Sequence, residues 1–205
     1  MTGYDNSLIP EPEKNPAPET ANFSDLVGAE WAKNAINILA DKKIINGKEE
    51  GKFCPDDYVT REEFLKMTVG GFYIKPASVS TLPFSDVTYG EWYYNSVMAA
   101  YQYNIVKGIS ETEFGIGRNI SRQDIAVILY NTLNVSGKSF ENYEEKADFS
   151  DFEKIAEYAQ KAVKAMQNAG IINGRDNNEF APEEPATRAE AAKMLYQVMY
   201  EFNMF

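Results

Sequence analysis

The tripeptide Phe23-Ser24-Asp25 occurs again as Phe84-Ser85-Asp86 and a third time as Phe149-Ser150-Asp151. Three landmarks follow each copy: a glycine 24 or 25 residues after the Phe, then a phenylalanine six residues and an arginine fourteen residues beyond that glycine. The landmarks are Gly47, Gly108 and Gly174, then Phe53, Phe114 and Phe180, then Arg61, Arg122 and Arg188. Such constant offsets indicate three related units, so functional sites should also come in threes.

The repeat sets the domain organisation. Each unit of 61 to 66 residues lies near the lower size limit for an independent core, so we expect the three to pack on one another. The expected units are repeat 1 (21–75), repeat 2 (82–135) and repeat 3 (147–203). Residues 1–20 carry four prolines among Glu, Asn and Lys, which is typical of an extended tail or linker. Such a tail is either a spacer or a segment with no role.

Composition narrows the classes of function. The 205-residue chain has a net charge of -11 and no long basic run, which argues against nucleic acid as a partner. With one cysteine, Cys54, and no histidine, it cannot form an intramolecular disulfide, a Ser/His triad or a histidine metal site. No stretch approaches the roughly 20 apolar residues of a membrane span, and we expect no cofactor. The first residues lack the apolar core of a signal peptide, so we expect a chain that is not exported or a piece of a longer or processed product.

Two helical patterns are expected in each repeat, so the predicted fold class is all-α. The first helix follows Phe-Ser-Asp and ends before the glycine turn; in repeat 1 its apolar face would contain Trp31, Ala35, Ile38 and Leu39. The second helix should begin at Thr60-Arg61-Glu62-Glu63 and at Thr187-Arg188-Ala189-Glu190. These are capping boxes, in which the hydroxyl accepts from a first-turn amide and the Glu reaches back. Ser121-Arg122-Gln123-Asp124 is a shorter-armed version.

The arginine inside each box has no such structural explanation. It occupies the first helical position, where the helix dipole makes a cation unfavourable by roughly 0.3–1 kcal/mol. One explanation is a structural salt bridge to Asp25, Asp86 or Asp151. The other is an anion site, because free helix amides and a guanidinium fork suit a carboxylate or phosphate. Both could hold at once, with the aspartate orienting the arginine.

Aromatic rings and turn cations also recur. Trp31 and Trp92 lie eight residues after the Phe of Phe-Ser-Asp, and Tyr158 lies nine residues after it. Such rings are either core residues or platforms on which a sugar ring stacks. The cations at the glycine turn are Lys48, Lys107 and Arg175. They are either ordinary charges favoured at a helix C-terminus or part of an anion site.

Taken in order, these motifs resemble the repeat of the S-layer homology family. That repeat runs from an F-x-D-V start through an I-x-x-G turn and an F-x-P loop to a T-R-A-E box. The matching pieces are Phe84-Ser85-Asp86-Val87, Ile44-Ile45-Asn46-Gly47, Phe53-Cys54-Pro55, Phe180-Ala181-Pro182 and Thr187-Arg188-Ala189-Glu190, and the resemblance covers about residues 21 to 202. It implies a pseudo-threefold, three-pronged spindle in which the helices after the boxes form a central three-helix bundle.

The resemblance also implies a function. Grooves between the prongs would bind the secondary cell wall polymer of Gram-positive-type bacteria, often through pyruvylated N-acetylmannosamine, with the box arginine meeting the pyruvate carboxylate. The chain would be a non-catalytic extracellular anchor for an S-layer protein or an enzyme cargo. The expected ligand-binding residues are Arg61, Arg122, Arg188, Trp31, Trp92, Tyr158, Asp25, Asp86, Asp151, Gly47, Gly108, Gly174, Lys48, Lys107 and Arg175. Because the repeats differ, for example at Ser121 and Tyr158, we expect one or two dominant sites.

Other functions stay open. A protein-interaction or lattice-assembly module would have its box arginines in structural salt bridges. A glycosidase needs two positioned carboxylates, but the carboxylates that recur here are caps and turn residues, so we expect no enzyme activity. Asp176-Asn177-Asn178 lacks the glycine and the distal Glu of an EF-hand loop, so we expect a turn there and no metal site.

Overall fold

The computed structural model describes residues 23–77, 81–140 and 143–205, so the predicted tail at 1–20 lies outside the described residues. Within these ranges the chain forms six α-helices and two short 3-10 helices, η2 (Phe152–Lys154) and η3 (Asp176–Asn178). Extended segments there meet only in isolated bridges, which confirms the all-α prediction. The α-helices are α1 (Glu30–Asp41), α2 (Arg61–Gly71), α3 (Tyr94–Gln102), α4 (Arg122–Val135), α5 (Glu157–Asn168) and α6 (Arg188–Glu201).

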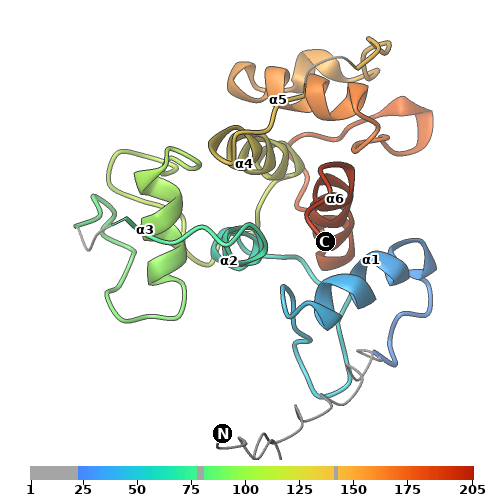
Figure 1. The fold of residues 1–205 in the computed structure, drawn as a ribbon. Helices are drawn as coiled ribbons and strands as arrows, with labels where there is room; N and C mark the ends of the chain where they lie inside the picture. Colours follow the sequence, from blue (N-terminus) through green and yellow to red (C-terminus); the bar gives the residue numbers. More distant parts are fainter. Residues whose placement is uncertain (1–22, 78–80, 141–142) are drawn as a thin grey trace, which may run out of the picture.

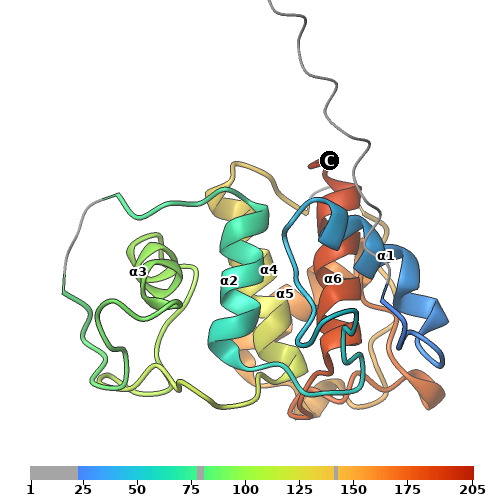
Figure 2. The same cartoon turned by 90° about the horizontal axis from the view of Figure 1, so that it is seen from below.

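Three helices lie at the centre of the molecule and three surround them. Figure 1 shows α2, α4 and α6 side by side in the middle, with α3, α5 and α1 outside them. Each outer helix packs on the central helix of another repeat: α3 on α2, α5 on α4 and α1 on α6. In the perpendicular view the helices at the two ends of the chain, α1 and α6, again lie together (Figure 2). The three repeats therefore form a closed ring.

The central helices begin where the sequence predicts. Thr60 precedes α2 and Thr187 precedes α6, and both capping boxes are closed. At the first box, Glu63 N donates to Thr60 Oγ1 and Thr60 N donates to Glu63 Oε2, at 3.4 and 2.9 Å. Ser121 caps α4 by accepting from Asp124 N, but the Asp124 carboxylate makes other contacts. An aspartate is one methylene shorter than a glutamate, so this box is only half formed.

The buried face of α1 differs from the predicted one. Its buried residues are Ala32, Ala35, Ile36 and Leu39, so the face is turned away from Trp31 and Ile38. Trp31 is 53% exposed. The two alanines on the buried face let α1 approach α6 closely, since helix separation depends on the side chains at the contact. No helix in the described ranges is both long and apolar enough to cross a membrane.

Candidate ligand-binding site

Each box arginine reaches out of its own repeat into the next one. Its Nε donates to the carbonyl of a fully buried phenylalanine, over whose ring the guanidinium lies at 4.7 to 5.3 Å from the ring centre. The Nε–O pairs are Arg61 with Phe114 (3.2 Å), Arg122 with Phe180 (2.8 Å) and Arg188 with Phe53 (3.0 Å). The third pair joins repeat 3 to repeat 1 and so closes the ring.

The charge partners of these arginines are not the predicted ones. Arg61 Nη1 donates to Asp124 Oδ2 and Arg122 Nη1 to Glu190 Oε1, both at 2.8 Å. Arg188 Nη2 donates instead to the carbonyl of Asn46 at 2.9 Å. Salt bridges are thus confirmed for two arginines. The prediction that Asp25, Asp86 or Asp151 would be the partner was wrong, because these aspartates bind backbone amides.

The expected free amides at the helix starts are also bonded. The backbone N–H of Arg61, Arg122 and Arg188 donates to the carbonyl of Arg118, Glu184 and Asp57, at 3.0, 3.0 and 2.8 Å. Each acceptor lies in the repeat that receives the guanidinium. The helix start therefore joins two repeats, and the first amide of each of these helices is not free to bind an anion, contrary to the prediction. The guanidiniums are themselves nearly covered, with 3 to 7% of each arginine exposed. Burial lowers the pKa of Arg122 and of Arg188, but arginines stay charged at neutral pH.

The three aspartates organise the loops that receive the arginines. Asp25 accepts from the N–H of Phe53 and Cys54 at 2.9 and 2.7 Å, and Asp151 accepts from Phe180 and Ala181 at 2.8 Å each. Asp86 makes the equivalent contacts in repeat 2. Desolvation acts to raise the pKa of Asp25 and Asp86, but the backbone donors outweigh it and the pKa of both carboxyls lies below its usual value. These carboxylates act inside the fold.

The turn glycines have an equally direct structural role. A Cβ atom at Gly47 would lie 2.9 Å from the ring of Phe23 and 2.4 Å from a backbone oxygen. A Cβ atom at Gly108 would lie 2.6 Å from the ring of Phe84, and one at Gly174 would lie 2.9 Å from the ring of Phe149. No other residue leaves room for this ring, so the recurrence of glycine follows from packing.

A cavity of about 620 Å³ opens where all three repeats meet beside α4. Arg61 comes to it from repeat 1, Lys107 and Gly108 from the turn of repeat 2, and Tyr158 from repeat 3. The structure therefore brings four predicted site residues together. The sequence did not single out other lining residues, among them Asn104, Ile109, Asp124 and Asn131. A cavity of this volume is large enough for a small ligand.

The cavity is positively charged although the protein is acidic. Its charged lining residues are Arg61, Lys107 and Asp124, two cations and one carboxylate. Asp124 bridges Arg61 and Tyr158, since its Oδ1 accepts from the phenolic hydroxyl at 2.8 Å. Burial and this hydrogen bond raise the pKa of Tyr158. The weakest contact of Arg61 is the 3.4 Å bond from Nη2 to the carbonyl of Lys107, which a better acceptor could replace.

The recurring aromatic rings lie at the surface, so the core explanation for them was wrong. Trp31, Trp92 and Tyr158 are 53, 49 and 61% exposed. Trp92 packs under a cation of α2, with Lys66 Nζ 4.8 Å from its ring centre. Contact of these rings with a sugar stays a prediction.

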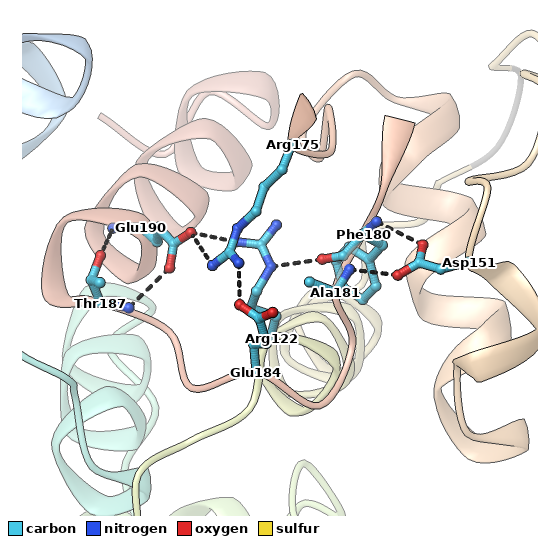
Figure 3. Close-up of polar contacts among 8 residues, drawn as sticks. All are labelled: Arg122, Asp151, Arg175, Phe180, Ala181, Glu184, Thr187 and Glu190. Carbon is cyan, nitrogen blue, oxygen red and sulfur yellow. Dashed lines mark hydrogen bonds and ion pairs between the residues drawn. The ribbon is translucent and has the colours of Figure 1, made fainter. Parts of the chain in front are cut away.

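The turn cations have different surroundings in the three repeats. Lys48 Nζ lies 2.8 Å from Asp57 Oδ2, whereas the exposed Lys107 lines the cavity. Arg175 donates to Glu184 and, at 2.9 Å, to Glu190 Oε1 (Figure 3). Burial alone would lower the pKa of Arg175, but these two carboxylates outweigh it and raise the pKa.

Metal ligands are not gathered in the described ranges: no three Asp, Glu or Cys side chains there are placed to hold one ion. The predicted turn at Asp176-Asn177-Asn178 is confirmed as η3.

The fold and the junctions define a class of protein, a helical domain of three tandem repeats in which each repeat buries its arginine in the next. The family profile of the S-layer homology domain matches residues 22–65, 83–126 and 148–192. The chain therefore belongs to the S-layer homology domain family, as the motifs suggested.

Relatives with different names share this domain. Exoglucanase XynX of Acetivibrio thermocellus is 31% identical over 209 residues, which cover 98% of this chain and 18% of that protein. An amylopullulanase of Thermoanaerobacterium thermosulfurigenes is 34% identical over 169 residues, covering 82% and 9%. The surface-layer 125 kDa protein of Lysinibacillus sphaericus is 25% identical over 176 residues, covering 86% and 14%. The chain thus spans less than a fifth of the length of each of these relatives.

Proposed function

We propose that this chain is a non-catalytic anchor that binds an anionic wall polysaccharide in the cavity beside Arg61 and so holds an attached cargo on the cell surface. Family membership supports the anchoring role. Proteins named as an exoglucanase, an amylopullulanase and a surface-layer protein all match this chain over a small fraction of their own length. A common role in attachment explains this distribution better than a common reaction. The setting would be the wall or S-layer of a Gram-positive-type bacterium.

The observation that carries the proposal is the cavity at the junction of the three repeats. A pyruvyl ketal on N-acetylmannosamine presents one carboxylate beside an apolar methyl group and a sugar ring. Arg61 Nη2 and Lys107 would bind the carboxylate, and the exposed ring of Tyr158 offers a flat surface for the sugar. Asp124 repels an anion, but both its oxygens already accept hydrogen bonds, from Arg61 and Tyr158.

Calorimetric titration with a pyruvylated N-acetylmannosamine fragment tests this function, with the unpyruvylated sugar as control. Arg61→Ala should weaken binding about 10- to 150-fold, since a charge-assisted contact contributes about 1.5–3 kcal/mol. Arg122→Ala is the matched control, because it removes the equivalent buried arginine from another junction. A folded Arg61→Ala variant that binds like the wild type would contradict the proposal.

The structural contacts of Arg122 and Arg188 favour a second candidate, a protein-interaction or lattice-assembly module. This function predicts that the chain self-associates and does not bind wall sacculi that retain their polymer. Sedimentation with such sacculi, and with sacculi stripped of polymer, separates the two functions.

A further inference from the structure

Two positions, one and ten residues after the turn glycine, hold an ion pair in two of the three repeats. In repeat 1 they are Lys48 and Asp57, and in repeat 3 they are Arg175 and Glu184. We call each of these a turn ion pair. In repeat 2 the same positions hold Ile109 and Arg118. An isoleucine cannot pair with a charge, so repeat 2 has no turn ion pair.

The second position of the pair lies against a box arginine in every repeat. Its backbone carbonyl accepts the N–H of that arginine, from Arg188 to Asp57, from Arg61 to Arg118 and from Arg122 to Glu184. The three positions are therefore equivalent in space as well as in sequence. What differs is the side chain beside the arginine, which is acidic in two repeats and basic in one.

In repeat 3 the turn ion pair builds a charge cluster on Arg122. Glu190 Oε1 accepts from Arg122 Nη1 at 2.8 Å and from Arg175 Nη2 at 2.9 Å, while Arg175 also holds Glu184 (Figure 3). Two guanidiniums thus already share the Glu190 carboxylate, and Arg175 also holds a second one. A ligand carboxylate would offer them the same chemistry that the protein supplies itself. The internal carboxylate also has the advantage of an effective concentration on the order of millimolar or more.

In repeat 2 the corresponding place is open. Ile109 lines the cavity, is 40% exposed and lies beside the arginine: a Cβ at Gly115 would be 3.1 Å from Ile109 Cγ2 and 3.3 Å from Arg61 Cδ. Arg118 occupies the second position, ten residues after the turn glycine, and places a cation where the other two repeats have a carboxylate. The side chain of Arg118 reaches only to 4.0 Å from Glu113.

We propose that the turn ion pair is an internal competitor for the anionic ligand, and that the groove beside Arg61 is the principal site because Ile109 and Arg118 replace the pair there. This inference rests on the proposed function and adds to it the residues that select one groove among three. The grooves beside Arg122 and Arg188 are then closed by the protein's own charges.

Exchanging the pairs between repeats tests the inference. Arg175→Ile with Glu184→Arg gives repeat 3 the residues of repeat 2, and Ile109→Arg with Arg118→Glu makes the reverse change. Titration with the pyruvylated N-acetylmannosamine fragment should show about one site in the wild type and about two in the first variant. The reverse variant should bind at least about tenfold more weakly. Glu49→Ala, which breaks the exposed Lys52–Glu49 pair, is the control and should leave both quantities unchanged.

Glu184→Gln provides a second variant that keeps the size of the side chain. It removes the competing charge and should also reveal a second site, should the double exchange fail to fold. Three equal sites in the wild type, or stoichiometries that no exchange alters, overturn the inference and leave the proposed function standing. Failure of the wild type to bind the pyruvylated fragment overturns both.

Discussion

Arg188→Ala should open the ring of repeats and destabilise the whole domain. Arg188 is 3% exposed and belongs to repeat 3, but its guanidinium is held by repeat 1. Its Nε and Nη2 donate to the carbonyls of Phe53 and Asn46, at 3.0 and 2.9 Å, and its charge lies over the Phe53 ring. Alanine at this position would remove both guanidinium donors, so the carbonyls of Phe53 and Asn46 would lose these hydrogen bonds.

The size of the effect follows from these contacts. Two hydrogen bonds from a charged donor contribute about 1.5–3 kcal/mol each, and a cation–π contact adds about 1 kcal/mol. Desolvation of the guanidinium offsets part of this gain, so we expect a net loss of about 3–5 kcal/mol. A chain of this size loses about 2–4 °C of melting temperature per kcal/mol, which predicts a fall of about 10 °C.

Thermal and guanidinium unfolding followed by circular dichroism would measure the loss. Arg118→Ala is the control, because the side chain of Arg118 is 65% exposed and its ion pair with Glu113 spans 4.0 Å. It should change the free energy of unfolding by less than about 0.5 kcal/mol. Equal melting temperatures for the two variants would refute the view that Arg188 closes the ring.

Three further predictions concern caps, pH and metal. Thr60→Ala and Thr187→Ala should each destabilise the fold by about 1 kcal/mol, and an unchanged melting temperature in both would show that the boxes contribute nothing. The pKa of Asp25 and of Asp86 is below its usual value, so their contribution to stability is present above about pH 4 and is lost as pH falls through the lowered pKa. Denaturant midpoints between pH 7 and pH 3 should therefore fall less steeply for Asp86→Asn than for the wild type; parallel curves would contradict this. Binding of wall polymer should survive EDTA treatment, and a loss that calcium restores would show that a metal takes part.

Local sequence signals predicted the elements of this fold well. The starts of α2, α4 and α6 were predicted to the residue, because a capping hydroxyl specifies a helix start through contacts within one turn. In α2 and α6 a glutamate three residues later completes the box. The face of α1 was harder, since Trp31 and Ala32 fit a helical pattern equally well. Which of the two residues is buried depends on the packing of α1 against α6. Residues 30–41 alone do not contain that information, because α6 lies far away in the sequence.

The partners of the arginines could not be predicted for the same reason. Within one repeat, Asp25 is the obvious carboxylate for Arg61, but the ring places each arginine against the next repeat. Asp124 illustrates the point: its position in a box predicts a cap, and its contacts are with Arg61 and Tyr158 of two other repeats. Constant spacing reveals that the units are related, but does not show which unit contacts which.

The same arginine side chain both connects two repeats and lines the proposed ligand site. A substitution of that arginine therefore cannot separate an effect on stability from an effect on affinity. Arg61 lines the cavity and also holds the carbonyl of Phe114, so its loss changes stability and affinity together. By linkage, a ligand bound at this junction also stabilises the ring, because it binds the closed form and not the unfolded chain. Residues that line the cavity without closing the ring separate the two effects. The side chains of Ile109 and Lys107 meet this condition, since Arg61 contacts only the backbone carbonyl of Lys107. Substitutions of these two side chains report on the ligand while the arginine contacts between the repeats stay in place.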